Sequence, residues 1–209
     1  MKYRHILFDI DGTLLDSEKT GVVSLQKTIR VLLGREEPLE KLYPYFGIPT
    51  PEAIAMIDFV DKEEATQTWE RYFQEMRSFI QPFEGVDELL SELSAREDCK
   101  MGVITSRGHF EINEDPQFMD RVHHFDTIIG AEDSEKHKPN PDPIFAYMER
   151  TGAKPEECIY IGDTIYDSKC AEGAGVDFAL INWTTRDNSH IPAKYYAKNC
   201  DDLRTIIEL

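Results

Sequence analysis

The apolar positions of the chain fall into short continuous runs, separated by stretches in which they recur every three or four residues. The continuous runs are typical of buried strands and occupy residues 4–8, 100–105, 125–130, 158–161 and 178–181. Amphipathic helices are predicted over 86–93, in a stretch that closes at Gly152, from about Asp167, and over 203–207. Strands that alternate with helices in this way form a mainly parallel sheet covered on both faces. The pattern therefore predicts an α/β fold with a Rossmann-like parallel sheet.

Residues 16–81 contain no good strand pattern, so we expect this segment to be helical. An apolar helix face from Val22 to Leu33 ends at Gly34, which is a natural helix stop. Thr50 followed by Pro51 predicts the N-cap and the first helical residue of a second helix.

A third helix is predicted to begin at Asp61, because Asp61 and Glu64 have the spacing of a capping box. We interpret its apolar face as core, and this face consists of Trp69, Tyr72, Phe73, Met76, Phe79 and Ile80. The first strand lies before the helical block and the other strands lie after it. We therefore expect a core of residues 1–15 and 82–209, with an all-helical cap inserted at 16–81.

The composition narrows the possible partners. The chain has 209 residues, of which 41% are hydrophobic, enough for a sizeable core. It carries 23 basic and 40 acidic residues, which give a formal net charge of -17. Such a charge repels nucleic acid and anionic membranes, so we expect neither as a partner. An anionic substrate would be repelled as well, unless its site holds a local positive centre.

The sequence also indicates a compartment. No apolar run reaches the roughly 18 residues that span a bilayer, and the N-terminus enters a strand pattern without a secretory signal. The cysteines are scattered without C-x-x-C spacing, at Cys99, Cys158, Cys170 and Cys200. This usage indicates reduced thiols, not a disulfide framework or a zinc site. We expect a cytoplasmic protein, either a monomer or a homodimer.

Two aspartates, Asp9 and Asp11, stand where the first strand ends. Alternate residues of a strand share a face, so the two carboxylates can point the same way. Carboxylates this close raise each other's pKa unless a cation neutralises them, which suggests a metal site, a proton-transfer site or both. The ordinary alternative is an edge strand that runs into a turn at Gly12. The rest of the chain has to decide between these interpretations.

Further polar residues follow the other predicted strands. Thr105 and Ser106 come after the second strand, Asp163 after the fourth, and Lys138 and Asp167 stand on nearby loops. Each has an ordinary explanation, as a strand-end hydroxyl, a solvated lysine, or a turn or N-cap aspartate. In open α/β sheets, however, ligands bind outside the carboxyl ends of the strands. The common location at that edge therefore favours a functional site.

The charges at this edge require a partner. Asp9, Asp11, Asp163 and Asp167 bring up to four negative charges together, and Lys138 supplies one positive charge. A divalent cation with oxygen ligands compensates such a group, and carboxylates with water and phosphate oxygens suit Mg²⁺. A metal, a lysine, a hydroxyl and backbone N–H groups can together hold a phosphoryl group.

These motifs resemble those of the haloacid dehalogenase-like hydrolases, in the branch with a helical cap inserted after the first motif. Residues 9–13 (Asp-Ile-Asp-Gly-Thr) are similar to the first motif, Thr105 to the second, Lys138 with Pro139 to the third, and residues 162–167 to the fourth. Residues 82–86 resemble the stretch that re-enters the core. The closest resemblance is to phosphoglycolate-phosphatase-like members, and it runs nearly end to end.

The resemblance implies a role for each matching position. Asp9 would be the nucleophile that forms an aspartyl-phosphate, and Asp11 the general acid and then the general base. Thr105 would hydrogen-bond the phosphoryl oxygens with help from the backbone N–H of Ser106. Lys138 would neutralise the phosphate and the nucleophile.

The resemblance also implies a metal site. Asp9, the main-chain carbonyl of Asp11 and Asp163 would ligate Mg²⁺, and Asp167 would orient waters or Lys138. The resulting expectation is a Mg²⁺-dependent phosphatase that acts on a small phosphorylated metabolite.

The cap is expected to set specificity through a loop at Phe46, Gly47 and Ile48, although a plain helix–helix connection explains this stretch nearly as well. Among the alternatives, dehalogenases of the family lack the second aspartate that stands here as Asp11. Sugar-phosphate mutases usually carry a histidine shortly after the first motif, and residues 16–21 contain none. A regulatory or binding module without turnover is a further alternative, but a pure binder would not need Asp11.

Overall fold

The computed structural model describes residues 2–184 and 188–208. Within these residues the strands form one six-stranded sheet in the order β3-β2-β1-β4-β5-β6, and all neighbouring strands are parallel. The strands are β1 (His5–Phe8), β2 (Lys100–Ile104), β3 (Thr127–Ile129), β4 (Cys158–Gly162), β5 (Asp177–Ile181) and β6 (Tyr195–Ala197). The parallel sheet confirms the predicted α/β fold.

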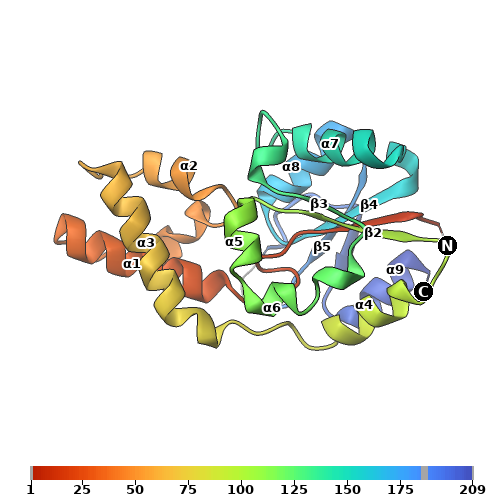
Figure 1. Cartoon of the computed structure of the whole chain (residues 1–209), viewed down its shortest axis with the longest axis horizontal. Helices are drawn as coiled ribbons and strands as arrows, with labels where there is room; N and C mark the ends of the chain where they lie inside the picture. Colours follow the sequence, from red (N-terminus) through yellow and green to blue (C-terminus); the bar gives the residue numbers. More distant parts are fainter. Residues whose placement is uncertain (1, 185–187, 209) are drawn as a thin grey trace. The chain divides into compact units, whose positions relative to one another are not determined.

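Helices cover both faces of this sheet (Figure 1). On one face α7 (Asp142–Thr151) and α8 (Ile165–Ala174) pack together, and on the other α4 (Val86–Ser94) packs with α9 (Cys200–Ile207). The core between the sheet and α7 includes Tyr147, which is fully buried. A Cβ atom on Gly102 of β2 would lie 2.2 Å from the Tyr147 ring, so the glycine allows this helix to approach the sheet.

The register of the central strands positions the loops that follow them. Phe8 of β1 pairs with Val103 of β2 and with Ile161 of β4. Because these strands are parallel and in step, the residues after them leave the sheet at the same edge. That edge therefore gathers residues that are far apart in the sequence.

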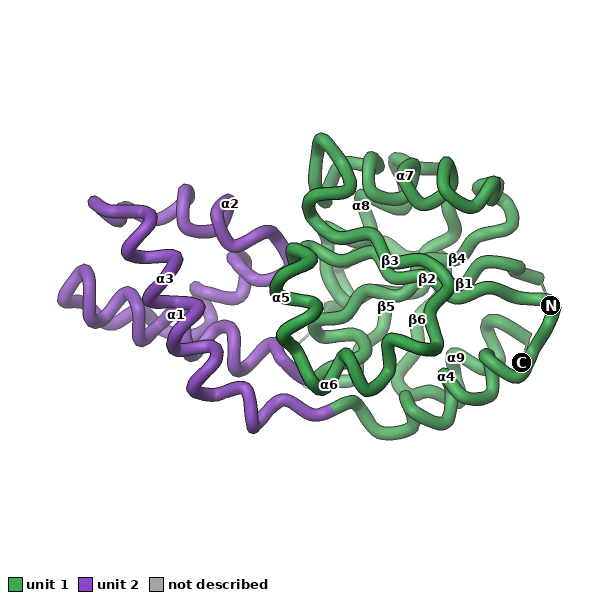
Figure 2. Tube along the Cα trace, viewed as in Figure 1, with its two compact units in different colours: residues 1–15, 82–209 green, residues 16–81 purple. Residues whose placement is uncertain are grey.

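The chain divides into two compact units, which Figure 2 shows in different colours. One unit contains the sheet and consists of residues 1–15 and 82–209, and the other consists of residues 16–81. The first unit is interrupted at one place only among its described residues, where an isolated bridge joins Leu15 to Pro82. The chain therefore leaves this unit and returns to it at neighbouring backbone positions.

The second unit is helical and has its own core. It contains α1 (Glu18–Leu33), α2 (Thr50–Ala55) and α3 (Lys62–Met76), with two short 3-10 turns between α1 and α2. The apolar faces of these helices meet around residues such as Leu25, Ile54 and Trp69. The indole N–H of Trp69 donates a 3.1 Å hydrogen bond to the backbone carbonyl of Gly21, which ties α3 to α1.

The helix ends follow the predictions in part. α1 stops at Gly34, which adopts a left-handed conformation, and Asp61 caps α3 by accepting a 2.9 Å hydrogen bond from the backbone N–H of Glu64. The prediction for Thr50 is wrong by one residue, because Thr50 is already helical and Pro49 precedes the helix without a side-chain cap.

Phe79 is not part of the core, contrary to the predicted apolar face of α3. It is 73% exposed, whereas Ile80 is fully buried. The reason is that α3 ends at Met76, and a 3-10 turn over Arg77–Phe79 follows. The tighter turn changes the angle between successive side chains, so the spacing of three or four residues no longer describes one face.

Three elements of the first unit lie outside the predicted set. They are β6 and two short helices after β2, namely α5 (His109–Asn113) and α6 (Pro116–Met119). Strand β3 covers only the residues Thr127–Ile129 of the predicted run 125–130. No helix in the described part of the chain is both long and apolar enough to cross a membrane.

Candidate active site

A buried ion pair joins Asp9, which directly follows β1, to Lys138 on the loop before α7. Both residues are only 2% exposed, and the Lys138 Nζ lies 2.9 Å from Asp9 Oδ1. The same ammonium donates to Asp167 Oδ1 at 2.8 Å and to the Tyr160 hydroxyl at 3.3 Å. Burial alone would lower the pKa of Lys138, but the carboxylates of Asp167 and Asp9 raise that pKa above its ordinary value. Lys138 is therefore a fixed positive charge against Asp9.

Asp167 is held by donors on both of its carboxylate oxygens. Its Oδ1 accepts from Lys138 and, at 2.7 Å, from the Tyr160 hydroxyl. Its Oδ2 accepts from the Thr164 hydroxyl at 2.5 Å and from the Thr164 backbone N–H at 3.0 Å. Thr164 is the N-cap of α8, so this capping box fixes Asp167 in the first helical turn. The four hydrogen bonds suit a residue that orients Lys138.

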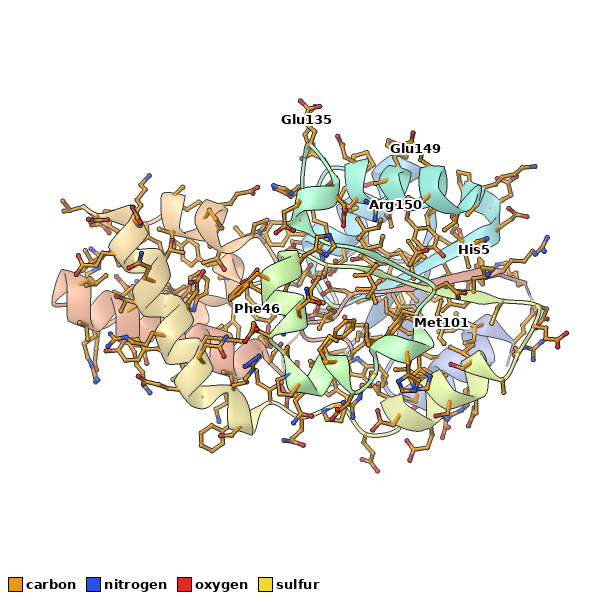
Figure 3. The ribbon with its side chains drawn as sticks, in the orientation of Figure 1. His5, Phe46, Met101, Glu135, Glu149 and Arg150 are labelled. Carbon is orange, nitrogen blue, oxygen red and sulfur yellow. The ribbon has the colours of Figure 1, made fainter. Side chains whose placement is uncertain are left out.

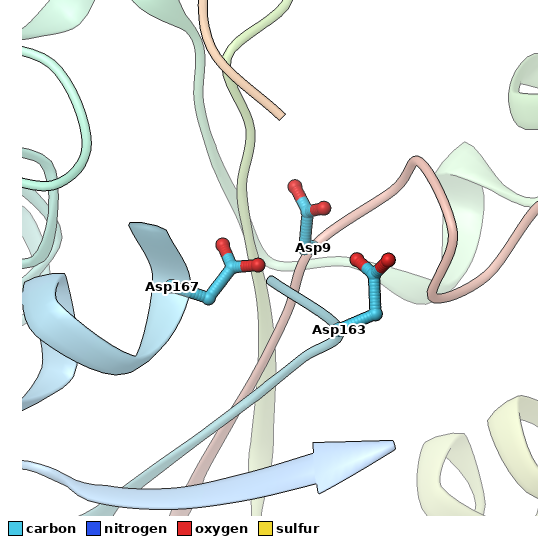
Figure 4. A group of neighbouring side chains, drawn as sticks. All are labelled: Asp9, Asp163 and Asp167. Carbon is cyan, nitrogen blue, oxygen red and sulfur yellow. The ribbon is translucent and has the colours of Figure 1, made fainter. Parts of the chain in front are cut away.

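Asp163, in the loop after β4, brings a further buried carboxylate to the same edge. Asp9, Asp163 and Asp167 each offer an oxygen within 4.8 Å of the others, and Figure 4 shows the three side chains. The Asp163 carboxylate packs directly against Gly12, which is possible only without a side chain, because a Cβ atom on Gly12 would lie 2.4 Å from Asp163 Oδ2. Asn188 steadies the loop by donating a 3.1 Å hydrogen bond to the Asp163 carbonyl.

The charge balance of this cluster fits a bound cation. Burial raises the pKa of Asp9 to about 7, and the negative charges of Asp167 and Asp11 add to the effect against the opposing charge of Lys138. One lysine therefore does not compensate the ionised carboxylates. Buried oxygen donors with an excess of negative charge are the ligand set of a hard divalent cation. The residues present fit such an ion, with Asp9 and Asp163 as the carboxylates that remain after Asp167 is engaged by its four donors.

Asp11 is bound by an arginine that the sequence analysis did not include in the site. Arg107 donates from Nε to Asp11 Oδ2 at 2.7 Å and from Nη2 to Asp11 Oδ1 at 2.5 Å. Its Nη1 donates to Asp115 Oδ2 at 2.5 Å. Burial would lower the pKa of Arg107, but the two carboxylates raise it above its ordinary value. A signal was present in the sequence, since an arginine next to Thr105 and Ser106 is a cation at the edge where acidic residues gather.

The predicted phosphate-binding residues lie at the same edge. Thr105 follows β2 and is buried, and its hydroxyl accepts a 3.2 Å hydrogen bond from the backbone N–H of Arg107. Ser106 is half-buried between these two residues. The structure therefore brings together Asp9, Asp11, Thr105, Ser106, Lys138, Asp163 and Asp167, and it adds Arg107, Asp115 and Tyr160.

The predicted cap residues Phe46, Gly47 and Ile48 belong to the helical unit. Phe46, which Figure 3 labels, follows a 3-10 turn and packs with Ile48 against the core of that unit. Its ring would lie 3.0 Å from a Cβ atom on Gly21 of α1. Gly47 has a φ of 91°, which is consistent with the tight loop expected there.

Comparisons with known proteins identify the family. The model of the haloacid dehalogenase-like hydrolases matches residues 6–181. The "Putative pyrophosphatase PpaX" of Caldanaerobacter subterraneus subsp. tengcongensis is 31% identical over 185 residues, covering 88% of this chain and 84% of that protein. A haloacid dehalogenase-like family hydrolase from Streptococcus pneumoniae has a TM-score of 0.80 at 25% identity, covering 99% of this chain and 98% of its own.

The fold is shared with a further solved structure. A "putative phosphoglycolate phosphatase" from Lactobacillus plantarum has a TM-score of 0.85 at 22% identity and covers 100% of both chains. The family model and the relative at 31% identity confirm both the resemblance seen in the motifs and the expectation of an enzyme. The chain belongs to the haloacid dehalogenase-like hydrolases.

Proposed function

We propose that the protein is a Mg²⁺-dependent phosphatase that hydrolyses a small phosphorylated metabolite through a covalent intermediate on Asp9. The observation that carries the proposal is the buried Asp9 carboxylate at the end of the central strand, fixed 2.9 Å from the Lys138 ammonium. A nucleophilic carboxylate needs a defined position and a charge that balances the incoming phosphoryl group. Membership of a hydrolase family supports the same reaction class.

In the proposed reaction, a carboxylate oxygen of Asp9 attacks the phosphorus atom and the P–O bond to the leaving group breaks. Water then attacks the phosphorus of the aspartyl-phosphate, which releases inorganic phosphate and restores Asp9. Asp11 gives a proton to the leaving oxygen in the first step and takes one from the water in the second. Thr105 and the backbone N–H of Ser106 would bind the phosphoryl oxygens.

The cation would be held by Asp9, Asp163 and the main-chain carbonyl of Asp11. When bound, Mg²⁺ supplies positive charge for the phosphoryl oxygens that one lysine cannot supply. Asp167 takes no part in ligation in this proposal, because its two oxygens already accept four hydrogen bonds and orient Lys138.

The relatives support two classes of substrate. One class is an organic phosphomonoester of the phosphoglycolate type, as in the name of the structural neighbour from L. plantarum. The other is inorganic pyrophosphate, as in the name of the relative at 31% identity. In both cases the loop at Phe46, Gly47 and Ile48 is proposed to select the leaving group.

A hydrolysis screen with Mg²⁺ tests the proposal. The substrates are p-nitrophenyl phosphate, phosphoglycolate, hexose phosphates and pyrophosphate, and the readout is released phosphate. We expect turnover of at least one substrate, loss of turnover in EDTA and its return with Mg²⁺. A hexose phosphate that is isomerised faster than it is hydrolysed would favour the mutase alternative.

The Asp9→Asn variant tests the nucleophile directly. We expect it to abolish turnover and also to abolish trapping of a hydroxylamine-sensitive phosphoenzyme. Asp120→Asn is the matched control, because Asp120 is an exposed aspartate and should be dispensable for both. Turnover by Asp9→Asn at the rate of the unmodified protein would refute the proposal, and turnover by neither protein would favour the binding module.

A further inference from the structure

We propose that Arg107, itself held by Asp115, is a positioning residue that fixes the carboxyl group of Asp11 for proton transfer. The proposal rests on the phosphatase reaction above, in which Asp11 protonates the leaving oxygen. It goes beyond that reaction by assigning two residues, Arg107 and Asp115, that act on substrate only through Asp11.

The geometry is that of a two-pronged ion pair. The Nε and Nη2 atoms of Arg107 reach the two oxygens of Asp11 at 2.7 Å and 2.5 Å, across 96 residues of sequence. Paired parallel N–H donors fix both the position of a carboxylate and the orientation of its plane. Without them, a side chain on the turn before Gly12 is free to change its rotamer. The paired hydrogen bonds therefore fix where the carboxyl group of Asp11 lies.

Asp115 holds the other end of the guanidinium. Its Oδ2 accepts from Arg107 Nη1 at 2.5 Å, while its Oδ1 caps α6 by accepting from the backbone N–H groups of Gln117 and Phe118 at 2.9 Å and 3.4 Å. Asp115 is only 2% exposed. One carboxylate oxygen thus secures the aspartate to a helix, and the other secures the arginine.

The backbone of Arg107 is secured as well. Its N–H donates to the Thr105 hydroxyl at 3.2 Å, and its carbonyl accepts from the Ala131 N–H at 2.9 Å. Arg107 is 8% exposed, so its guanidinium is largely shielded from water. A buried cation that is anchored at both ends and that binds a proposed acid is more than a surface ion pair, which contributes little.

The test compares two substrates whose leaving groups differ in their need for a proton. An alkyl phosphate needs a proton on its leaving oxygen, whereas p-nitrophenolate leaves readily without one. We expect Asp11→Asn to lower kcat/KM strongly for the alkyl phosphate and weakly for p-nitrophenyl phosphate. Arg107→Met should show the same selectivity, with a loss on the order of 100-fold for the alkyl phosphate because the acid is misplaced. KM should change little, since Arg107 does not touch substrate.

Three further variants make the assignment specific. Asp115→Asn keeps an oxygen for the helix cap but places an amide against Arg107, so we expect a smaller loss with the same selectivity. The double variant Asp11→Asn/Arg107→Met should be no worse than Asp11→Asn, because the arginine acts through that carboxyl. Arg121→Met is the matched control, since Arg121 forms a similar fork with Asp87 at 2.5 Å and 2.7 Å outside the site.

Several results would overturn the proposal. Equal losses on both substrates would mean a structural role, and a raised KM at unchanged kcat would mean direct contact with substrate. Activity of Arg107→Met at or above that of the unmodified protein would mean that the ion pair with Arg107 does not assist proton transfer by Asp11. If Arg107→Met does not fold, Asp115→Asn decides by the same selectivity. These outcomes are distinct from failure of the proposed function, in which the unmodified protein itself would hydrolyse neither substrate.

Discussion

Replacing Asp9 with asparagine is expected to change how the stability of the metal-free protein depends on pH. Burial raises the pKa of this carboxyl from 3.8 to about 7, with Asp167 and Asp11 adding to the rise and Lys138 opposing it. In the unfolded chain the same carboxyl is solvated and loses its proton near the ordinary value. The folded protein therefore retains a proton that the unfolded chain releases.

The sign follows from this difference in bound protons. Between about pH 4 and pH 7 the folded state holds more protons, so the free energy of unfolding falls as the pH rises and levels off above pH 7. At about 1.4 kcal/mol per pKa unit, the full effect is about 4 kcal/mol, of which about 2 to 3 kcal/mol falls between pH 5 and pH 8. Asparagine cannot titrate, so the free energy of unfolding of Asp9→Asn does not fall with pH in this way.

Urea unfolding in EDTA at pH 5, 6, 7 and 8 measures the effect. A Trp69→Phe background leaves Trp183 as the fluorescent tryptophan of the chain, and Trp183 stacks on Phe83 in the unit that contains Asp9. The free energy of unfolding of Asp9→Asn, minus that of the background protein, should rise by about 2 to 3 kcal/mol from pH 5 to pH 8.

A difference between Asp9→Asn and the background protein that is flat, or that falls with pH, would refute this reasoning. Mg²⁺ provides an internal check, because a cation that binds the ionised carboxylate stabilises only a protein that has one. At pH 8 we expect Mg²⁺ to stabilise the background protein more than Asp9→Asn. Equal stabilisation of both would exclude Asp9 as a ligand.

Three further substitutions test the packing of the first unit. Gly12→Ala, at a φ of 77° and with its Cβ 2.4 Å from Asp163 Oδ2, should abolish phosphatase turnover, and normal kcat would contradict this. Gly102→Ala should press on the Tyr147 ring and lower the free energy of unfolding by about 1 to 3 kcal/mol, and an unchanged Tm would count against it. Tyr160→Phe should lower the free energy of unfolding by about 1 to 3 kcal/mol, because it removes a buried hydroxyl that donates to Asp167 Oδ1 and accepts from Lys138. It should also lower kcat at unchanged KM, whereas a raised KM would indicate contact with substrate.

The parts of the fold that were predictable are those with a strong local pattern. Strands β1, β2, β4 and β5 are continuous apolar runs because both faces of a parallel sheet are covered, and α1 ends at a glycine that adopts a left-handed conformation. Strand β6 and helices α5 and α6 have three to five residues each, so they are too short to show a recurring pattern of apolar positions. The prediction that Phe79 is part of the core was wrong for a related reason, because the helical spacing of three or four residues does not continue through a 3-10 turn.

The candidate site was predictable where its residues follow strands. Asp9, Thr105 and Asp163 stand directly after apolar runs, so the topology alone puts them at one edge. The role of Arg107 was not predictable in the same way, because its contacts with Asp11 and Asp115 depend on the tertiary fold. Nothing in the local sequence shows that Asp11 lies beside a residue 96 positions later.

The bridge between Leu15 and Pro82 has a consequence for how such a protein can evolve. The chain leaves the sheet-containing unit and rejoins it at neighbouring backbone positions, so residues 16–81 form an insertion whose two ends lie close together. No strand of the sheet is interrupted by it, and the end-to-end distance that an insert must span there is short. A segment of different length or composition can therefore replace it with little entropic penalty. New recognition surfaces can be tried at this position while Asp9 and its neighbours stay unchanged.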